Sequence, residues 1–152
     1  MKMIKLLFSL VIGLVLASCG RAQPIEPPKV PTGYLYKVEP GIPGKQVYVC
    51  NQRPFTTTGE LVGPGNLRLQ AQQVFDNLKT SLQTVDMTLQ NVTQITYSIR
   101  GASTAVDTVS SRALNTLAMA YFTNMPAIIE MKNVSQLARE DVLIEVEVVA
   151  VK

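Results

Sequence analysis

The chain has 152 residues, of which 47% are hydrophobic and 16% charged, and its formal net charge is +3. That length suits one domain behind a short export segment. The sequence has no histidine, which excludes serine–histidine and cysteine–histidine catalysis, and neither a metal site nor a cofactor is expected. Lysine and arginine form no dense stripe, so nucleic acid is not an expected partner.

Residues 1–18 have the composition of a secretory signal peptide. Lys2 and Lys5 give a basic start, and residues 6–17 carry no charge. As a helix this run is roughly 18 Å long at about 1.5 Å per residue. A membrane span needs about 20 apolar residues, so the run predicts a cleaved signal rather than a span.

The end of this segment, Leu16-Ala17-Ser18-Cys19, resembles the lipobox of bacterial lipoproteins. The resemblance implies that Cys19 is the first mature residue and carries acyl chains such as palmitate, which anchor the protein to a membrane of the cell envelope. Gly20 permits placement at the outer membrane or on the periplasmic face. The alternative is a plain signal peptide with an incidental cysteine. Mature Cys50 then has no partner for an intrachain disulfide.

Removal of residues 1–18 leaves 134 residues with twelve basic and eleven acidic side chains, a net charge of +1. Residues 19–33 contain four prolines and predict an extended tether to the membrane. The folded domain is expected over residues 34–152. Its first predicted strand covers residues 47–51, and a loop rich in glycine, proline and threonine follows over residues 53–65.

Asn66 is a helix-capping residue, and the apolar spacing after it predicts a helix to about Asp86. The expected buried stripe of this helix is Leu67, Ala71, Val74, Phe75, Leu78, Leu82 and Val85. Residues 92–100 alternate between apolar and polar side chains, which predicts a half-buried strand that ends at Gly101.

Thr104 and Asp107 have the spacing of a capping box, which predicts the start of a second helix. The apolar stripe expected for that helix is Val106, Val109, Ala113, Leu117, Ala120 and Tyr121. Pro126 marks its end. A further strand is predicted over residues 128–134.

The most clearly patterned strand is predicted over residues 142–151. One face is wholly apolar: Val142, Ile144, Val146, Val148 and Ala150. The other face mixes apolar and acidic side chains: Leu143, Glu145, Glu147, Val149 and Val151. Because helices cover one side of such a sheet, the mixed face favours contact with another subunit. The order of elements predicts an α+β domain with two helices on one face of a mixed sheet.

Several of these segments together resemble the Rid family of reactive-intermediate deaminases, also called YjgF-type proteins. The matching pieces are Thr58-Gly59-Glu60-Leu61, residues 72–79, Leu89-Gln90-Asn91-Val92, Pro126-Ala127 and residues 141–151. The likeness covers roughly residues 34–151. It implies a chorismate-mutase-like fold and a homotrimer, in which the sheets form a central barrel and three pockets lie between neighbouring subunits.

Active members of the family hydrolyse 2-imino acids to 2-keto acids and ammonia. In the family an arginine directly follows the Pro-Ala pair and holds the substrate carboxylate, a task that suits a bidentate guanidinium. Here the matching residue is Ile128, which cannot bind a carboxylate. The resemblance therefore implies a pocket that has lost the standard substrate.

The other pocket positions of the family are matched in part. Glu145 matches the pocket glutamate and either holds a water or fixes the subunit interface, while Glu147 is expected to be structural. Tyr36 falls near a pocket tyrosine of the family, although a core or surface tyrosine is the simpler interpretation. Cys50 is expected to be a buried small side chain rather than a nucleophile. Arg53 and Arg139 are the candidate replacement cations, although each is more simply a solvated loop charge.

Three functions are compatible with these residues. The first is an exported, lipid-anchored Rid-family protein that binds a different, uncharged or aromatic, small molecule between subunits and lacks 2-imino acid deaminase activity. The second is an imine or enamine deaminase for a substrate without a carboxylate, with Glu145 organising the water. The third is a non-enzymatic trimeric binding module.

Overall fold

The computed structural model describes residues 34–36, 46–103 and 105–152, the first of these segments by its backbone alone. The predicted signal peptide 1–18, the lipidated Cys19 and the tether 19–33 lie outside the described residues, as does Thr104. Among the described helices, none is both long enough and apolar enough to cross a membrane.

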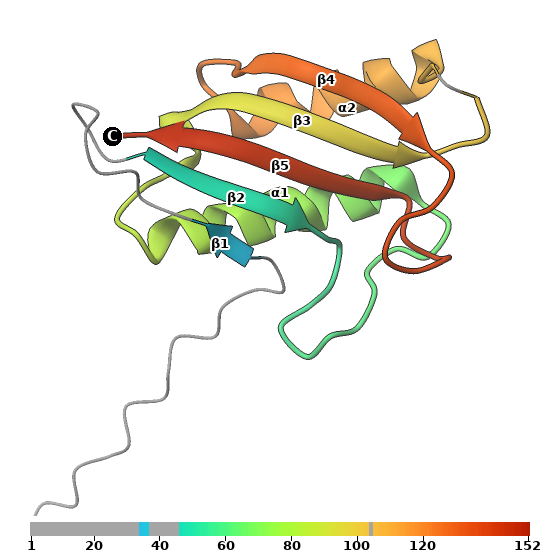
Figure 1. The fold of residues 1–152 in the computed structure, drawn as a ribbon, viewed down its shortest axis with the longest axis horizontal. Coiled ribbons are helices and arrows are strands. Elements are labelled where there is room, and N and C mark those ends of the chain that lie inside the picture. The colour runs from blue at the N-terminus through green and yellow to red at the C-terminus, as the bar shows by residue number, and fades with distance from the viewer. Residues whose placement is uncertain (1–33, 37–45, 104) are drawn as a thin grey trace, which may run out of the picture.

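The described chain forms a five-stranded mixed sheet and two α-helices (Figure 1). The elements are β1 (Tyr34–Tyr36), β2 (Gln46–Gln52), α1 (Leu67–Gln83), the 3₁₀ turn η1 (Leu89–Asn91), β3 (Val92–Arg100), α2 (Thr108–Tyr121), β4 (Ala127–Val134) and β5 (Ile144–Val151). The strand order is β1-β2-β5-β3-β4. Both helices lie on the same face of the sheet, which confirms the predicted α+β class.

The strand directions bring several chain segments together at one end of the sheet. Strand β5 is antiparallel to both β2 and β3, and β4 is parallel to β3. Strands β2, β3 and β4 therefore run in the same direction and end where β5 begins (Figure 1). The residues that follow β2 and β3 and those that open β5 consequently lie near one another.

Helix α1 follows the predicted pattern except at its end. Asn66 caps it, since its side chain accepts a hydrogen bond from the Leu69 amide at 3.1 Å. The predicted stripe faces the sheet and is largely buried. The helix ends at Gln83 rather than near Asp86, because Asp86 has a left-handed φ of 59° and the Met87 amide bonds back to Leu82.

Helix α2 differs from the prediction at its start and in its buried face. Asp107, not Thr104, is the N-cap, and its carboxylate accepts a hydrogen bond from the Ser110 amide at 2.9 Å. Leu114 and Ala118 are the buried residues of the helix, whereas Val109 is 79% exposed. Of the predicted stripe, Val106, Leu117 and Tyr121 pack against the core, whereas Val109, Ala113 and Ala120 are exposed, because the helix contacts the core along a narrow edge.

Strand boundaries shift by one or two residues from those expected. Strand β4 begins at Ala127, one residue early, and β5 begins at Ile144, because Val142 closes a turn onto the carbonyl of Arg139. The apolar face predicted for the last strand is confirmed as fully buried. The short β1 and η1 were not predicted, since three residues carry too little periodicity to be recognised.

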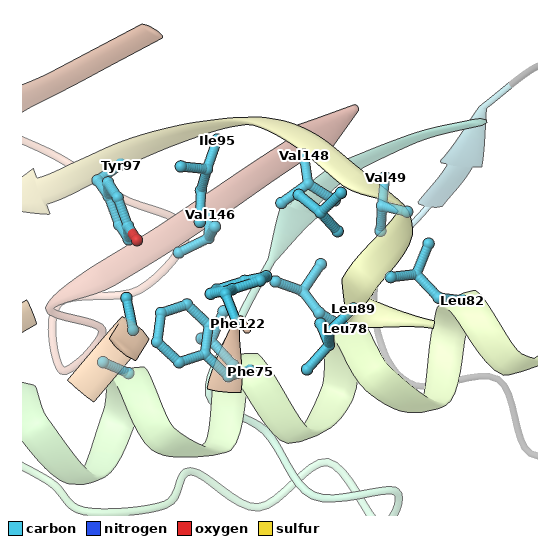
Figure 2. Close-up of a cluster of buried hydrophobic side chains, with 14 of the residues drawn as sticks. Val49, Phe75, Leu78, Leu82, Leu89, Ile95, Tyr97, Phe122, Val146 and Val148 are labelled. Carbon is cyan, nitrogen blue, oxygen red and sulfur yellow. The ribbon is translucent and has the colours of Figure 1, made fainter. Parts of the chain in front are cut away.

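The core lies between the sheet and the two helices (Figure 2). Ile95, Tyr97, Val146 and Val148 point from the strands toward Phe75 and Leu78 of α1. The Phe75 ring lies 5.5 Å from Phe122 and 6.5 Å from Tyr97, both edge to face. This packing fixes α1 on the sheet and so fixes the loops attached to its ends.

Candidate functional site

The face of the sheet opposite the helices carries polar side chains next to apolar ones. A small hollow of about 110 Å³ on this face is lined by residues of four strands. They include Tyr48 and Cys50 of β2, Thr96 of β3, Ile129 of β4 and Glu147 of β5. The mixed face predicted for the last strand is thus the uncovered face of the sheet in the single chain.

Glu145 is the buried carboxylate of this region, with only 9% of the residue exposed. It is the second residue of β5, at the end of the sheet where the other strands stop. Its Oε1 atom accepts hydrogen bonds from Arg53 Nε at 3.0 Å and from the Ala138 amide at 3.1 Å. Among the described residues, Oε2 has no hydrogen-bond partner.

Arg53 follows β2 directly and reaches across to Glu145. Its side chain is 31% exposed and that of Glu145 11%. A charge-assisted bond of this kind is stronger than a neutral one. Sequence alone favoured a solvated loop charge at Arg53, but the structure makes it the cation of the Glu145 carboxylate.

Arg139 also forms an ion pair, in its case with Asp141. Its Nε donates to Asp141 Oδ1 at 3.0 Å, and its guanidinium carbon lies 5.1 Å from the centre of the Phe55 ring. A hollow of about 550 Å³ beside it is lined by Arg100 and residues 135–140, the loop whose Ala138 amide binds Glu145. The predicted replacement cations thus both lie near this end of the sheet, each already paired with a carboxylate.

Ile128 and Glu145 are not brought together within one chain. Ile128 is opposite Ile95, whereas Glu145 is opposite Ser98, two strands away. At about 4.8 Å between strands and about 3.3 Å per residue, their backbones are more than about 10 Å apart. Strand β4 has a bulge between the residues that pair with Ile95 and Thr96. The bulge places Ile129 in the hollow on the sheet face opposite the helices. Ile128 is 42% exposed.

Tyr36 is likewise distant from Glu145 along the sheet. It pairs with Tyr48 of β2, which in turn pairs with Val149 of β5, four residues beyond Glu145. The single chain therefore joins Arg53 with Glu145, and leaves Ile128 and Tyr36 elsewhere on the sheet.

Cys50 is half-buried on the open face rather than buried in the core. Burial raises the pKa of its thiol above the ordinary value, and the negative charge of Glu147 raises the pKa further. A thiol in this setting is a poor nucleophile at neutral pH. Cys50 was expected to be a buried small side chain, and its half-buried location on this face differs from that expectation.

Two contacts of the site were not predicted from the sequence. The backbone amide of Ala138 cannot be recognised from side-chain chemistry. Asn77 donates to the carbonyl of Arg53 at 2.8 Å. Asn77 is buried on the flank of the apolar stripe of α1, beside the buried polar residues Gln70 and Ser81.

A mixed sheet that carries two helices on one face, with its polar centre at the strand ends, defines a chorismate-mutase-like α+β protein. A family model described as Endoribonuclease L-PSP matches residues 28–152. The chain belongs to this family, which is the YjgF or Rid family. Among curated protein sequences, none matches the chain.

Solved structures of the family share the fold. RidA from the Antarctic bacterium Psychrobacter sp. is 25% identical, with a TM-score of 0.66, over 86% of this chain and 99% of that one. A Thermotoga maritima protein is 28% identical, with a TM-score of 0.62, over 84% and 94%. Escherichia coli TdcF with bound serine is 21% identical, with a TM-score of 0.60, over 76% and 91%.

Proposed function

We propose that this chain is an exported, membrane-anchored Rid-family protein that binds a small uncharged molecule between subunits and lacks 2-imino acid deaminase activity. The observation that carries the proposal is the ion pair between Arg53 and Glu145. Together with Ile128 at the position where active members have the carboxylate-binding arginine, it means that the cation in contact with Glu145 is already paired.

Most of the described cations near Glu145 are paired with a carboxylate, whereas Arg100 donates to the backbone carbonyls of Glu140 and Arg139. Arg53 is paired with Glu145, Arg139 with Asp141, and Lys132 with Glu130 at 2.7 Å. A substrate carboxylate would have to displace Glu145 from Arg53 and leave a buried carboxylate with one hydrogen bond fewer, which is unfavourable. A neutral ligand can instead use the free oxygen of Glu145 without breaking the pair. The same pairing argues against RNA cleavage, although the family model is described as an endoribonuclease.

A matched pair of probes tests the ligand class. Benzamide and benzoate have similar size and differ in charge. We expect benzamide to raise the melting temperature of the purified protein, and benzoate to raise it less or not at all. The proposal fails if benzoate is the better ligand and Arg53→Gln abolishes its effect, because Arg53 would then serve as the missing carboxylate site.

The proposed lipid anchor and the proposed trimer are supported mainly by sequence patterns. The lipobox-like segment that ends at Cys19 supports lipidation, and the half-exposed outer face of β5 supports a subunit interface. Cells fed labelled palmitate should label the wild-type chain and not Cys19→Ser, and native mass spectrometry should give a trimer. A palmitate-free wild-type chain in the soluble fraction would contradict the anchor, and a monomer would contradict the shared pocket.

A second candidate function is hydrolytic deamination of an imine or enamine that has no carboxylate. The free Oε2 of Glu145, which is held in place by Arg53 and Ala138, favours it, because a fixed carboxylate can orient a water for attack. Release of ammonia from a panel of neutral enamines should then fall strongly in Glu145→Gln. Equal turnover by the wild type and Glu145→Gln would contradict this candidate. Ligand binding without turnover of any enamine would support the first proposal, and a closed pocket that binds no ligand would favour the non-enzymatic trimeric module.

A further inference from the structure

We propose that Gln70 and Asn77 of α1 are positioning residues that together set the geometry of the Arg53–Glu145 pair. The inference rests on the proposed function only in taking that pair as the polar centre of the ligand site. Both amides are buried, with 0% of Gln70 and 5% of Asn77 exposed.

Asn77 holds the segment that carries Arg53. Its Nδ2 donates to the carbonyl oxygen of Arg53 at 2.8 Å and to that of Phe55 at 2.9 Å. Its Oδ1 accepts a hydrogen bond from Gln73 at 2.9 Å, which fixes the orientation of the amide. The chain leaves the sheet at Arg53, so no strand ladder holds it there and the Asn77 amide takes that role.

Gln70 holds the segment that leads to Glu145. Its Nε2 donates to the carbonyl of Asp141 at 2.8 Å, and its Oε1 accepts from the Leu143 amide at 2.7 Å. Leu143 lies two residues before Glu145, outside β5, so its amide would otherwise lack a strand partner. Gln70 therefore takes the place of a neighbouring strand at this point.

The two residues are seven positions apart, which is about two turns and places them on the same face of α1. Helix α1 is thus hydrogen-bonded to the backbone of both segments that carry the ion pair. Arg53 and Glu145 are held at bonding distance because the same helix sets the location of each segment. A purely structural role for the amides would stabilise the fold without affecting the pair.

Hydrogen exchange at Arg53 Nε separates these two roles. This proton lies in the bond to Glu145, and its exchange can be followed by nitrogen-15 NMR of the ligand-free protein. Asn77→Asp keeps the shape but removes the donor, and Gln70→Met removes the hydrogen bonds of Gln70 to Asp141, Leu143 and Gly63 at similar volume. We expect each to speed exchange at Arg53 Nε about fivefold or more.

Val74→Ala is the matched control, because Val74 is fully buried on the same helix between the two amides and makes no polar contact. It should lower stability without changing the exchange at Arg53 Nε. The inference is overturned if Asn77→Asp or Gln70→Met folds and leaves that exchange unchanged. If either variant fails to fold, Asn77→Ser or Gln70→Leu replaces it. Unchanged exchange at Arg53 Nε in the replacement likewise overturns the inference. The result does not depend on ligand binding, so failure of the proposed function would be distinguishable.

Discussion

Arg53 Nε lies 3.0 Å from Oε1 of Glu145, although 92 residues separate them in the sequence. The contact joins the end of β2 to the start of β5, the place where the topology collects the strand ends. The family resemblance assigns Glu145 to the pocket, and under the proposed function its cation limits which ligands bind there. That cation is Arg53 of the same chain, and it already forms an ion pair with Glu145.

The pair should show coupling in unfolding experiments. We expect Arg53→Met and Glu145→Gln each to lower the free energy of unfolding by about 1 kcal/mol, and the double variant to lose less than the sum, because neither charge is then left unpaired. Urea denaturation of the four proteins measures this. Strictly additive losses would show that the contact contributes nothing to stability.

Asp107 gives helix α2 a dependence on acid pH. Hydrogen bonds from Ser110 lower the pKa of this carboxyl below the usual value of about 3.9. The carboxylate therefore stabilises the fold above the unfolded-state pKa, and this contribution is lost as the pH falls through the lower folded-state pKa. Asp107→Asn keeps a cap but cannot titrate, so its stability should fall less than that of wild type between about pH 5 and pH 2.

The measurement is urea denaturation of both proteins across that pH range. Asp76→Asn serves as a control for the removal of one acidic charge, because Asp76 is exposed and accepts a bond from Tyr121 rather than capping a helix. Identical pH profiles for the wild type and Asp107→Asn would contradict the role of Asp107.

Cys50 should be alkylated slowly near neutral pH. Burial and Glu147 raise the pKa of its thiol, so less thiolate is present than in an ordinary cysteine. Glu147→Gln removes the repulsion and should speed alkylation by iodoacetamide, followed at the Cys50 peptide by mass spectrometry. Because Glu130 is farther from Cys50 on the edge strand, Glu130→Gln should change the rate less. A slower reaction in Glu147→Gln would contradict the electrostatic explanation.

Phe75 should be among the residues that contribute most to stability. It is fully buried and contacts three other aromatic rings. Phe75→Ala should cost about 3–5 kcal/mol through lost burial and the cavity left behind. Gln72→Ala, at an exposed site of the same helix, should change the free energy of unfolding little. A loss below about 1 kcal/mol in the free energy of unfolding would show that the core is not centred on the Phe75 ring.

Much of the fold was predictable because it depends on local periodicity. The stripe of α1 and the alternation of β3 and β5 each report burial on one face, and the structure confirms them. The buried face of helix α2 was predicted only in part: Val109, Ala113 and Ala120 have the right spacing but are exposed. Apolar spacing indicates which residues share a face, not whether the rest of the domain covers that face.

The site was less predictable for a different reason. Glu145 could be identified from its place in a resembling strand, but its partners depend on topology. Arg53 reaches Glu145 because β2 ends where β5 begins. Ala138 contacts Glu145 through its backbone amide, which no side-chain pattern in the sequence indicates. Cys50 was placed on a strand but not on the correct face, since a single small residue fits either one.

The most direct test of the central claim is the rate at which the purified wild-type protein hydrolyses freshly generated 2-iminopropanoate. We expect ammonia release no faster than in buffer, because Ile128 cannot hold the substrate carboxylate and Arg53 is paired with Glu145. We expect Ile128→Arg to gain activity if the neighbouring subunit completes the pocket. Hydrolysis by the wild type at rates typical of active family members would contradict the proposed function.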